Sequence, residues 1–138
     1  MTYPEALQEL VEEFHAIEDK RERLEMLFEL ADEVVELPND QWDDETRVRG
    51  CQSEAHVRIG ITDGRIQFLS AADARMVQCL MGILTIALDC LTPAQAVLIP
   101  PTFAEEMGLL NTLTPSRSNG FRNMYDKVMT ELRQNRGD

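Results

Sequence analysis

The chain has 138 residues, of which 43% are hydrophobic, and its formal net charge is −12. This length suits one compact unit with a buried core, so we expect residues 1–138 to form a single domain. Residues 1–45 carry 16 acidic and 3 basic side chains. Because nucleic acids and anionic membranes attract clustered Lys and Arg, this composition argues against both as partners.

The start of the chain, residues 1–5, lacks the basic and apolar regions of a secretory signal, and a cytoplasmic location is expected. No apolar run is long enough to predict a membrane span. The three cysteines, Cys51, Cys79 and Cys90, include no Cys-x-x-Cys pair. We therefore expect reduced thiols, with neither a metal site nor a bound cofactor.

Two acidic, amphipathic helices are predicted in the first 38 residues. Thr2-x-x-Glu5 has the pattern of a capping box for the first helix, and Asp19 is the expected N-cap of the second. Pro38 is expected to end the second helix. Solvated helix faces explain the acidic charge, and a basic partner surface is the alternative.

The middle of the chain predicts a small sheet. Residues 55–61 alternate between apolar and polar, and Asp63-Gly64 predicts a hairpin turn into a second strand over residues 65–69. Residues 47–51 are also predicted to be extended. We expect an α+β fold, in which a small antiparallel sheet of about three strands packs on helices with one face.

A long apolar helix is predicted to follow Asp73, whose carboxylate is expected to cap it. If this helix continues to Cys90, then Cys79 and Cys90 lie on one helical face. Buried cysteines behave as small hydrophobic residues, so both are expected to pack in the core. A last helix is predicted after a loop over residues 109–116.

Cys51 has a different setting from the other two thiols. Gly50 precedes it and the polar residues 52–54 follow it, which predicts a loop that enters a strand. If residues 47–51 are extended, Arg47 and Arg49 lie on the same side as the thiol and favour the thiolate, the form that attacks sulfur. A small buried residue at the start of a strand explains the local sequence equally well.

His56 lies five residues after Cys51 and is a candidate proton partner for the thiol. A histidine on the exposed face of the strand explains the residue equally simply. A cysteine-dependent hydrolase that uses Cys51 and His56 is one alternative function, and a non-catalytic, acidic protein-binding module is another.

Residues 114–120 form a second unusual segment. Ser116 or Ser118 is expected to cap the last helix, and Arg117 lies near the start of that helix. Helix capping with a solvated arginine accounts for this pattern without any further role.

Three motifs together resemble the SufE family in residue identity, order and spacing, across nearly the whole chain. They are Gly50-Cys51-Gln52-Ser53, Asp73-Ala74-x-x-Val77 and Leu113-Thr114-Pro115-Ser116-Arg117-Ser118-x-Gly120. The resemblance implies helices packed on one side of a curved antiparallel sheet, similar to iron–sulfur scaffold proteins. Cys79, Ala72 and His56 depart from the residues that are usual in that family.

The resemblance also implies a function. Cys51 would accept persulfide sulfur from a pyridoxal-phosphate-dependent cysteine desulfurase, stimulate that enzyme and pass the sulfur to an iron–sulfur cluster scaffold. The chain would need no cofactor of its own and would be a monomer or a weak dimer. The residues expected to shape the sulfur site or its docking surface are Gly50, Gln52, Ser53, Arg49, His56, Asp73 and Arg117.

Overall fold

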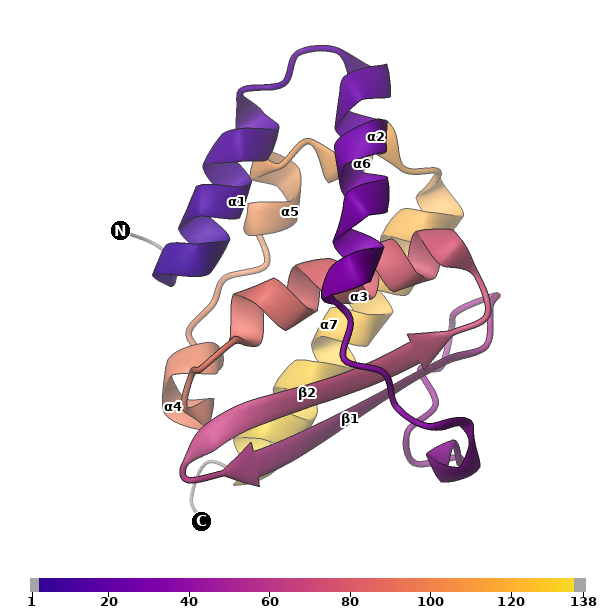
Figure 1. The fold of residues 1–138 in the computed structure, drawn as a ribbon, viewed down its shortest axis with the longest axis vertical. Coiled ribbons are helices and arrows are strands. Elements are labelled where there is room, and N and C mark those ends of the chain that lie inside the picture. Colours follow the sequence, from indigo (N-terminus) through magenta and orange to yellow (C-terminus); the bar gives the residue numbers. More distant parts are fainter. Residues whose placement is uncertain (1–2, 136–138) are drawn as a thin grey trace.

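The computed structural model describes residues 3–135, except for the side chains of residues 110 and 135. Strands β1 (Ala55–Thr62) and β2 (Arg65–Ala72) form an antiparallel hairpin. Helix α3 packs on β2 and α7 packs on β1, while α1 and α2 lie beyond α3 on the side away from the sheet (Figure 1). The expected α+β class is confirmed.

The predicted hairpin turn is also confirmed. Asp63 and Gly64 both have left-handed backbone angles, with φ values of 53° and 77°. A two-residue turn with this geometry matches the right-handed twist of the strands it joins, which is why Asp-Gly is favoured there. The prediction of a third strand is wrong: within residues 3–135 the structure contains two strands, and Arg47 makes an isolated bridge to His56.

Seven α-helices and two short 3-10 helices accompany the hairpin in the described chain. Asp19 caps α2 by accepting a hydrogen bond from the Arg21 N–H, as predicted. Pro4 is the N-cap of α1, and Thr2 of the predicted capping box lies outside the described residues. The helices are α1 (Glu5–His15), α2 (Lys20–Glu29), α3 (Arg75–Leu88), α4 (Pro93–Ala96), α5 (Phe103–Glu106), α6 (Leu109–Thr112) and α7 (Pro115–Asn135), with η1 (Leu30–Glu33) and η2 (Asn39–Gln41).

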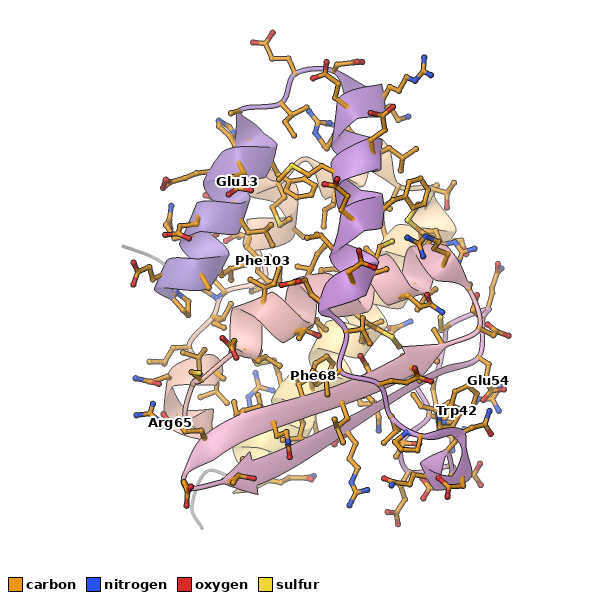
Figure 2. All side chains as sticks on the ribbon, in the orientation of Figure 1. Glu13, Trp42, Glu54, Arg65, Phe68 and Phe103 are labelled. Carbon is orange, nitrogen blue, oxygen red and sulfur yellow. The ribbon has the colours of Figure 1, made fainter. Side chains whose placement is uncertain are left out.

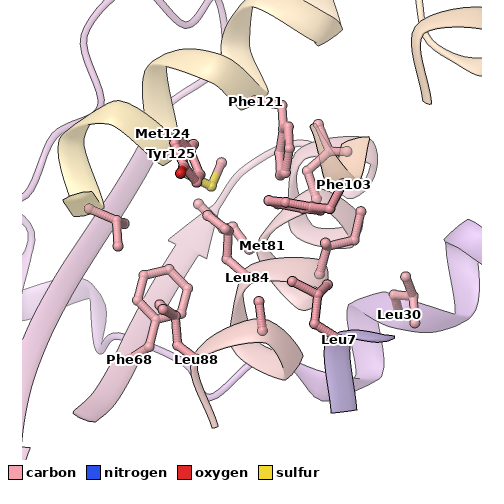
Figure 3. Packing of buried hydrophobic residues seen from close by; sticks show 14 of the residues in the cluster. Leu7, Leu30, Phe68, Met81, Leu84, Leu88, Phe103, Phe121, Met124 and Tyr125 are labelled. Atoms are coloured by element: carbon pink, nitrogen blue, oxygen red, sulfur yellow. The ribbon is translucent and has the colours of Figure 1, made fainter. Parts of the chain in front are cut away.

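Helix α3 is the centre of the hydrophobic core. Its side chains Met81, Leu84 and Leu88 lie between Phe68 of β2 and a group from α7 that includes Met124 (Figure 3). On its other side α3 crosses the 3-10 helix η1 at very short range. A Cβ atom on Gly82 would lie 1.9 Å from the Leu30 carbonyl oxygen, so glycine is required at this crossing.

Three expectations about helix ends are wrong. The second helix was expected to continue to Pro38, but α2 ends at Glu29 and the 3-10 helix η1 that follows ends at Glu33. Helix α3 ends at Leu88, and Cys90 follows it in an exposed turn with φ of 59°, so Cys90 does not share a buried face with Cys79. The predicted loop over residues 109–116 contains α6, and α7 already begins at Pro115. The hydroxyl of Thr114, rather than that of Ser116 or Ser118, accepts the Arg117 N–H at the start of α7.

Candidate functional site

Cys51 lies on a short loop, residues 49–54, whose two ends are fixed in the core. The Val48 N–H donates to the Ala55 carbonyl over 2.8 Å, and both residues are buried. Between them Gly50 turns the chain with φ of 79°, and Cys51 is partly exposed. The turn breaks the extended conformation predicted for residues 47–51, whereas the predicted loop around Cys51 is present.

The thiol lines a small pocket between this loop, α3 and α7. Apolar walls come from Val77 and Leu80 of α3 and from Met124 of α7, and Arg117 contributes a charged side chain. The free space has room for about one water-sized group. Gly120 of α7 also lines the pocket, and a Cβ atom placed on it would lie 3.6 Å from Cys51 Sγ.

Two side chains of α7 hold the loop against the helix. Arg117 Nη1 donates to Ser53 Oγ over 3.2 Å, and Asn123 Nδ2 donates to the Gly50 carbonyl over 3.3 Å. A Cβ atom on Gly50 would lie 2.5 Å from Asn123 Nδ2, so a side chain there would force Asn123 to shift, and the φ of 79° itself favours glycine. Sequence analysis missed Asn123, although its spacing of three residues from Gly120 places it on the helical face that meets the loop.

Asp73 fixes the C-terminal end of the loop instead of capping α3. Its carboxylate accepts the Glu54 N–H over 3.1 Å, and its own N–H donates to the Glu54 carbonyl over 3.1 Å. The N-cap position of α3 is Ala74. The predicted capping role is therefore wrong, and the residue instead connects the loop to the beginning of α3.

His56 is buried, with 3% of its surface exposed, so the expectation of an exposed strand histidine is wrong. Its Nδ1 forms a hydrogen bond of 2.7 Å with Thr46 Oγ1, and its Nε2 forms one of 2.6 Å with Glu54 Oε2. The ring stacks on Trp42 with a centroid distance of 4.6 Å. Figure 2 shows Trp42 and Glu54 at the end of the sheet opposite the hairpin turn. Both ring nitrogens of His56 are thus engaged away from the Cys51 pocket.

Arg117 contributes a positively charged side chain to the pocket of the thiol, whereas the two arginines that precede Cys51 are not among the residues that line it. Arg47 Nη1 lies 3.8 Å from Glu54 Oε2 in a half-exposed ion pair, and Arg49 is exposed in the turn at Gly50. Because the turn ends the strand alternation, the expected common face of Arg47, Arg49 and Cys51 does not form.

The other two thiols have unlike surroundings. Cys79 is fully buried, as predicted, and burial raises the pKa of its thiol more than the nearby charge of Arg75 lowers it. A protonated, enclosed thiol is a poor nucleophile. Cys90 is exposed, and all three thiols are free. Across residues 3–135, no group of three or more His, Cys, Asp or Glu side chains is arranged to hold a metal ion.

Comparison with known proteins identifies the family of the chain. The model of the SufE family, described as an Fe–S metabolism associated domain, matches residues 8–132. The chain belongs to the SufE family. An uncharacterised SufE-like protein of Synechocystis is 32% identical over 130 residues, which are 94% of this chain and 82% of that protein.

A second relative, SufE-like protein 1 of Arabidopsis thaliana, carries the description chloroplastic/mitochondrial. It is 29% identical over 122 residues, which are 88% of this SufE-family chain and 33% of the plant protein. A hypothetical protein of Thermus thermophilus, known from its solution structure, shares the fold with a TM-score of 0.84 and 22% identity over 99% of both chains. In the described part of the chain, no helix has the length and apolar character to cross a membrane.

Proposed function

We propose that this SufE-family chain is a sulfur acceptor, which takes persulfide sulfur from a cysteine desulfurase onto Cys51 and passes it to an iron–sulfur cluster scaffold. The observation that carries the proposal is a free thiol on a short loop, at a pocket with room for one additional small group. Pyridoxal phosphate would belong to the donor enzyme, and this chain would supply the thiol and its surroundings.

The chemistry is a thiol–persulfide exchange. The Cys51 thiolate attacks the outer sulfur of the donor persulfide, a new S–S bond forms, and the donor cysteine leaves as a thiolate. The guanidinium of Arg117, which lines the same pocket, offers a positive charge to the anionic sulfur. Removing the product from the donor frees that enzyme for its next turnover, which accounts for stimulation.

The pocket also suits storage of the reactive product. Persulfides and thiolates are open to oxidation and to exchange with other thiols in proportion to their exposure. The apolar side chains of Val77, Leu80 and Met124 surround the sulfur on the protein side. Sulfur held there would survive between loading and delivery better than sulfur on an exposed residue such as Cys90.

Transfer requires the thiol to leave this pocket and enter a partner's active site. On the side of α7, the loop is held by the hydrogen bonds of Arg117 to Ser53 and of Asn123 to Gly50. Each such bond contributes about 0.5–1.5 kcal/mol, so the loop can swing outward at a cost of a few kcal/mol while Val48 and Ala55 stay in place. The exposed side chains of Arg49, Gln52 and Asp73 around it would meet the partner.

The hydrolase alternative finds no support in the contacts of His56. Its two nitrogens bond to Thr46 and Glu54, so neither is available to take a proton from Cys51. These contacts instead hold Glu54, and with it the end of the loop. A structural role for His56 next to the sulfur site is therefore the interpretation we favour.

The test is to incubate the protein with a desulfurase and free cysteine and to search by mass spectrometry for one extra sulfur atom on the peptide that contains Cys51. Cys51→Ser is the control. We expect the extra mass in the wild type and its loss in the variant. An unmodified Cys51 peptide in the wild type would reject the proposal, and burst release from an ester substrate would favour the hydrolase.

A further inference from the structure

Gly120 is a buried glycine inside helix α7, five residues after the start of the helix. A glycine in a helix interior is less favourable than alanine by about 1 kcal/mol, because its unfolded backbone has more freedom to lose. Such a residue calls for a packing reason. At the other helical glycine, Gly82, the reason is plain, since a Cβ atom would overlap the backbone of Leu30.

The structure with a free thiol provides no such reason at Gly120. Outside its own helix, a Cβ atom there would meet a single atom within 4 Å, Cys51 Sγ, at a distance of 3.6 Å. That distance is ordinary van der Waals contact, so alanine would fit beside the thiol. The space above Gly120 therefore exceeds what the reduced protein needs.

We propose that Gly120 keeps open the space that the outer sulfur of the Cys51 persulfide occupies. This inference rests on the proposed function of Cys51. A second sulfur bonds to Sγ at about 2 Å, and it cannot share a gap of 3.6 Å with a methyl group. The other walls near the thiol are already filled by Val77, Leu80 and Met124.

Gly120 thus determines which form of Cys51 the pocket accepts. With glycine, the pocket holds both the thiol and the persulfide. With alanine, it would hold the thiol alone, and the outer sulfur of a loaded protein would be displaced toward solvent. Gly120 therefore determines whether the pocket can hold the sulfur-loaded form of Cys51, and it takes no part in forming the S–S bond.

The test compares wild type, Gly120→Ala and, as a matched control, Asn119→Ala, which alters the adjacent exposed position of the same helix. Each protein is loaded with inorganic polysulfide, from which the Cys51 thiolate takes one sulfur atom and leaves a polysulfide one atom shorter. Cyanide then removes the outer sulfur as thiocyanate and restores the thiolate. The fraction of persulfide left on the Cys51 peptide is followed by mass spectrometry.

We expect Gly120→Ala to lose its outer sulfur about tenfold faster than wild type, the factor that a modest overpacking penalty produces. Asn119→Ala should match wild type. Alkylation of the unloaded Cys51 by iodoacetamide should proceed at the same rate in all three proteins, and thermal unfolding should show that each is folded.

Equal rates of sulfur loss in wild type and Gly120→Ala would overturn the inference. An equal acceleration of alkylation and sulfur loss would also overturn it, because the alanine would then have displaced the whole loop. Loading by polysulfide does not depend on a protein donor. Failure of a desulfurase to load wild-type Cys51 would therefore reject the proposed function, and it would be recognised separately from a failure of the role of Gly120.

Discussion

Cys51 and Cys79 have opposite settings, although both thiols lie at helix α3. Cys79 is part of α3 and is fully buried, and its Sγ donates a hydrogen bond to the Phe28 carbonyl oxygen over 3.7 Å. Cys51 rests against Val77 and Leu80 of α3 from a loop that side-chain hydrogen bonds hold on α7. Both thiols have apolar neighbours, so under the proposed function it is the attachment of Cys51 to a loop that would let its sulfur reach a partner.

The largest expected contrast is between the two alanine variants of these cysteines. Cys51→Ala should abolish sulfur uptake and stimulation of a desulfurase while leaving stability near that of wild type. Cys79→Ala should keep both activities and lower the free energy of unfolding by about 1 kcal/mol, because it leaves a small cavity. Alanine released by the desulfurase measures the first effect, and urea unfolding measures the second. Loss of uptake in folded Cys79→Ala would contradict the contrast.

The two helical glycines should also respond in opposite directions. Gly82→Ala should destabilise the protein by about 3 kcal/mol or more, because its Cβ would overlap the Leu30 carbonyl. Gly120→Ala should raise the free energy of unfolding of the unloaded protein by up to about 1 kcal/mol. Urea unfolding of both variants checks this pair. Similar decreases in the free energy of unfolding for both variants would show that Gly120 is needed for packing in the reduced state.

The features that were predicted correctly from the sequence depend on residues that are close together along the chain. Asp63-Gly64 determines the hairpin through its own backbone preferences, and Asp19 caps α2 through a contact two residues away. The loop at Cys51 followed from Gly50 and the polar residues after the thiol. In each case the physical cause lies within a few residues.

The features that sequence missed depend on contacts between distant segments. Asp73 was expected to cap its own helix, yet its carboxylate bonds to the backbone of Glu54, 19 residues earlier. His56 was assigned to an exposed face by strand alternation, but Trp42 covers it. Asn123 meets Gly50 across 73 residues of chain. Such pairings follow from how the elements pack, which local patterns do not encode.

Removing the hydrogen bond from Asn123 to the Gly50 carbonyl should loosen the Cys51 loop without altering the thiol. Asn123→Ala should remove about 1 kcal/mol of the interaction that holds the loop on α7. Iodoacetamide should then alkylate Cys51 roughly fivefold faster, with little change in global unfolding. Asn119→Ala is the control on the same helix. An unchanged alkylation rate would mean that this bond does not restrain the loop.

A smaller effect is expected in the pH dependence of the free energy of unfolding, to which the buried thiol of Cys79 should contribute. Burial raises the pKa of Cys79 in the folded protein, so the folded state keeps this proton where the unfolded chain loses it. The contribution of Cys79 to the free energy of unfolding should therefore be constant below about pH 8.5 and fall as the pH rises above it. Urea unfolding of wild type and Cys79→Ala at about pH 7 and about pH 9.5 tests this. Identical pH dependence in the two proteins would contradict it.

The central claim is that Cys51, and neither of the other two thiols, receives the sulfur. The most direct measurement is a single-turnover transfer from a desulfurase supplied with cysteine that carries radioactive sulfur, stopped at short times and followed by separation of the three cysteine-containing peptides. The account predicts that the label arrives first, and almost entirely, on the Cys51 peptide. First arrival on Cys90, or equal labelling of Cys51→Ser and wild type, would contradict it.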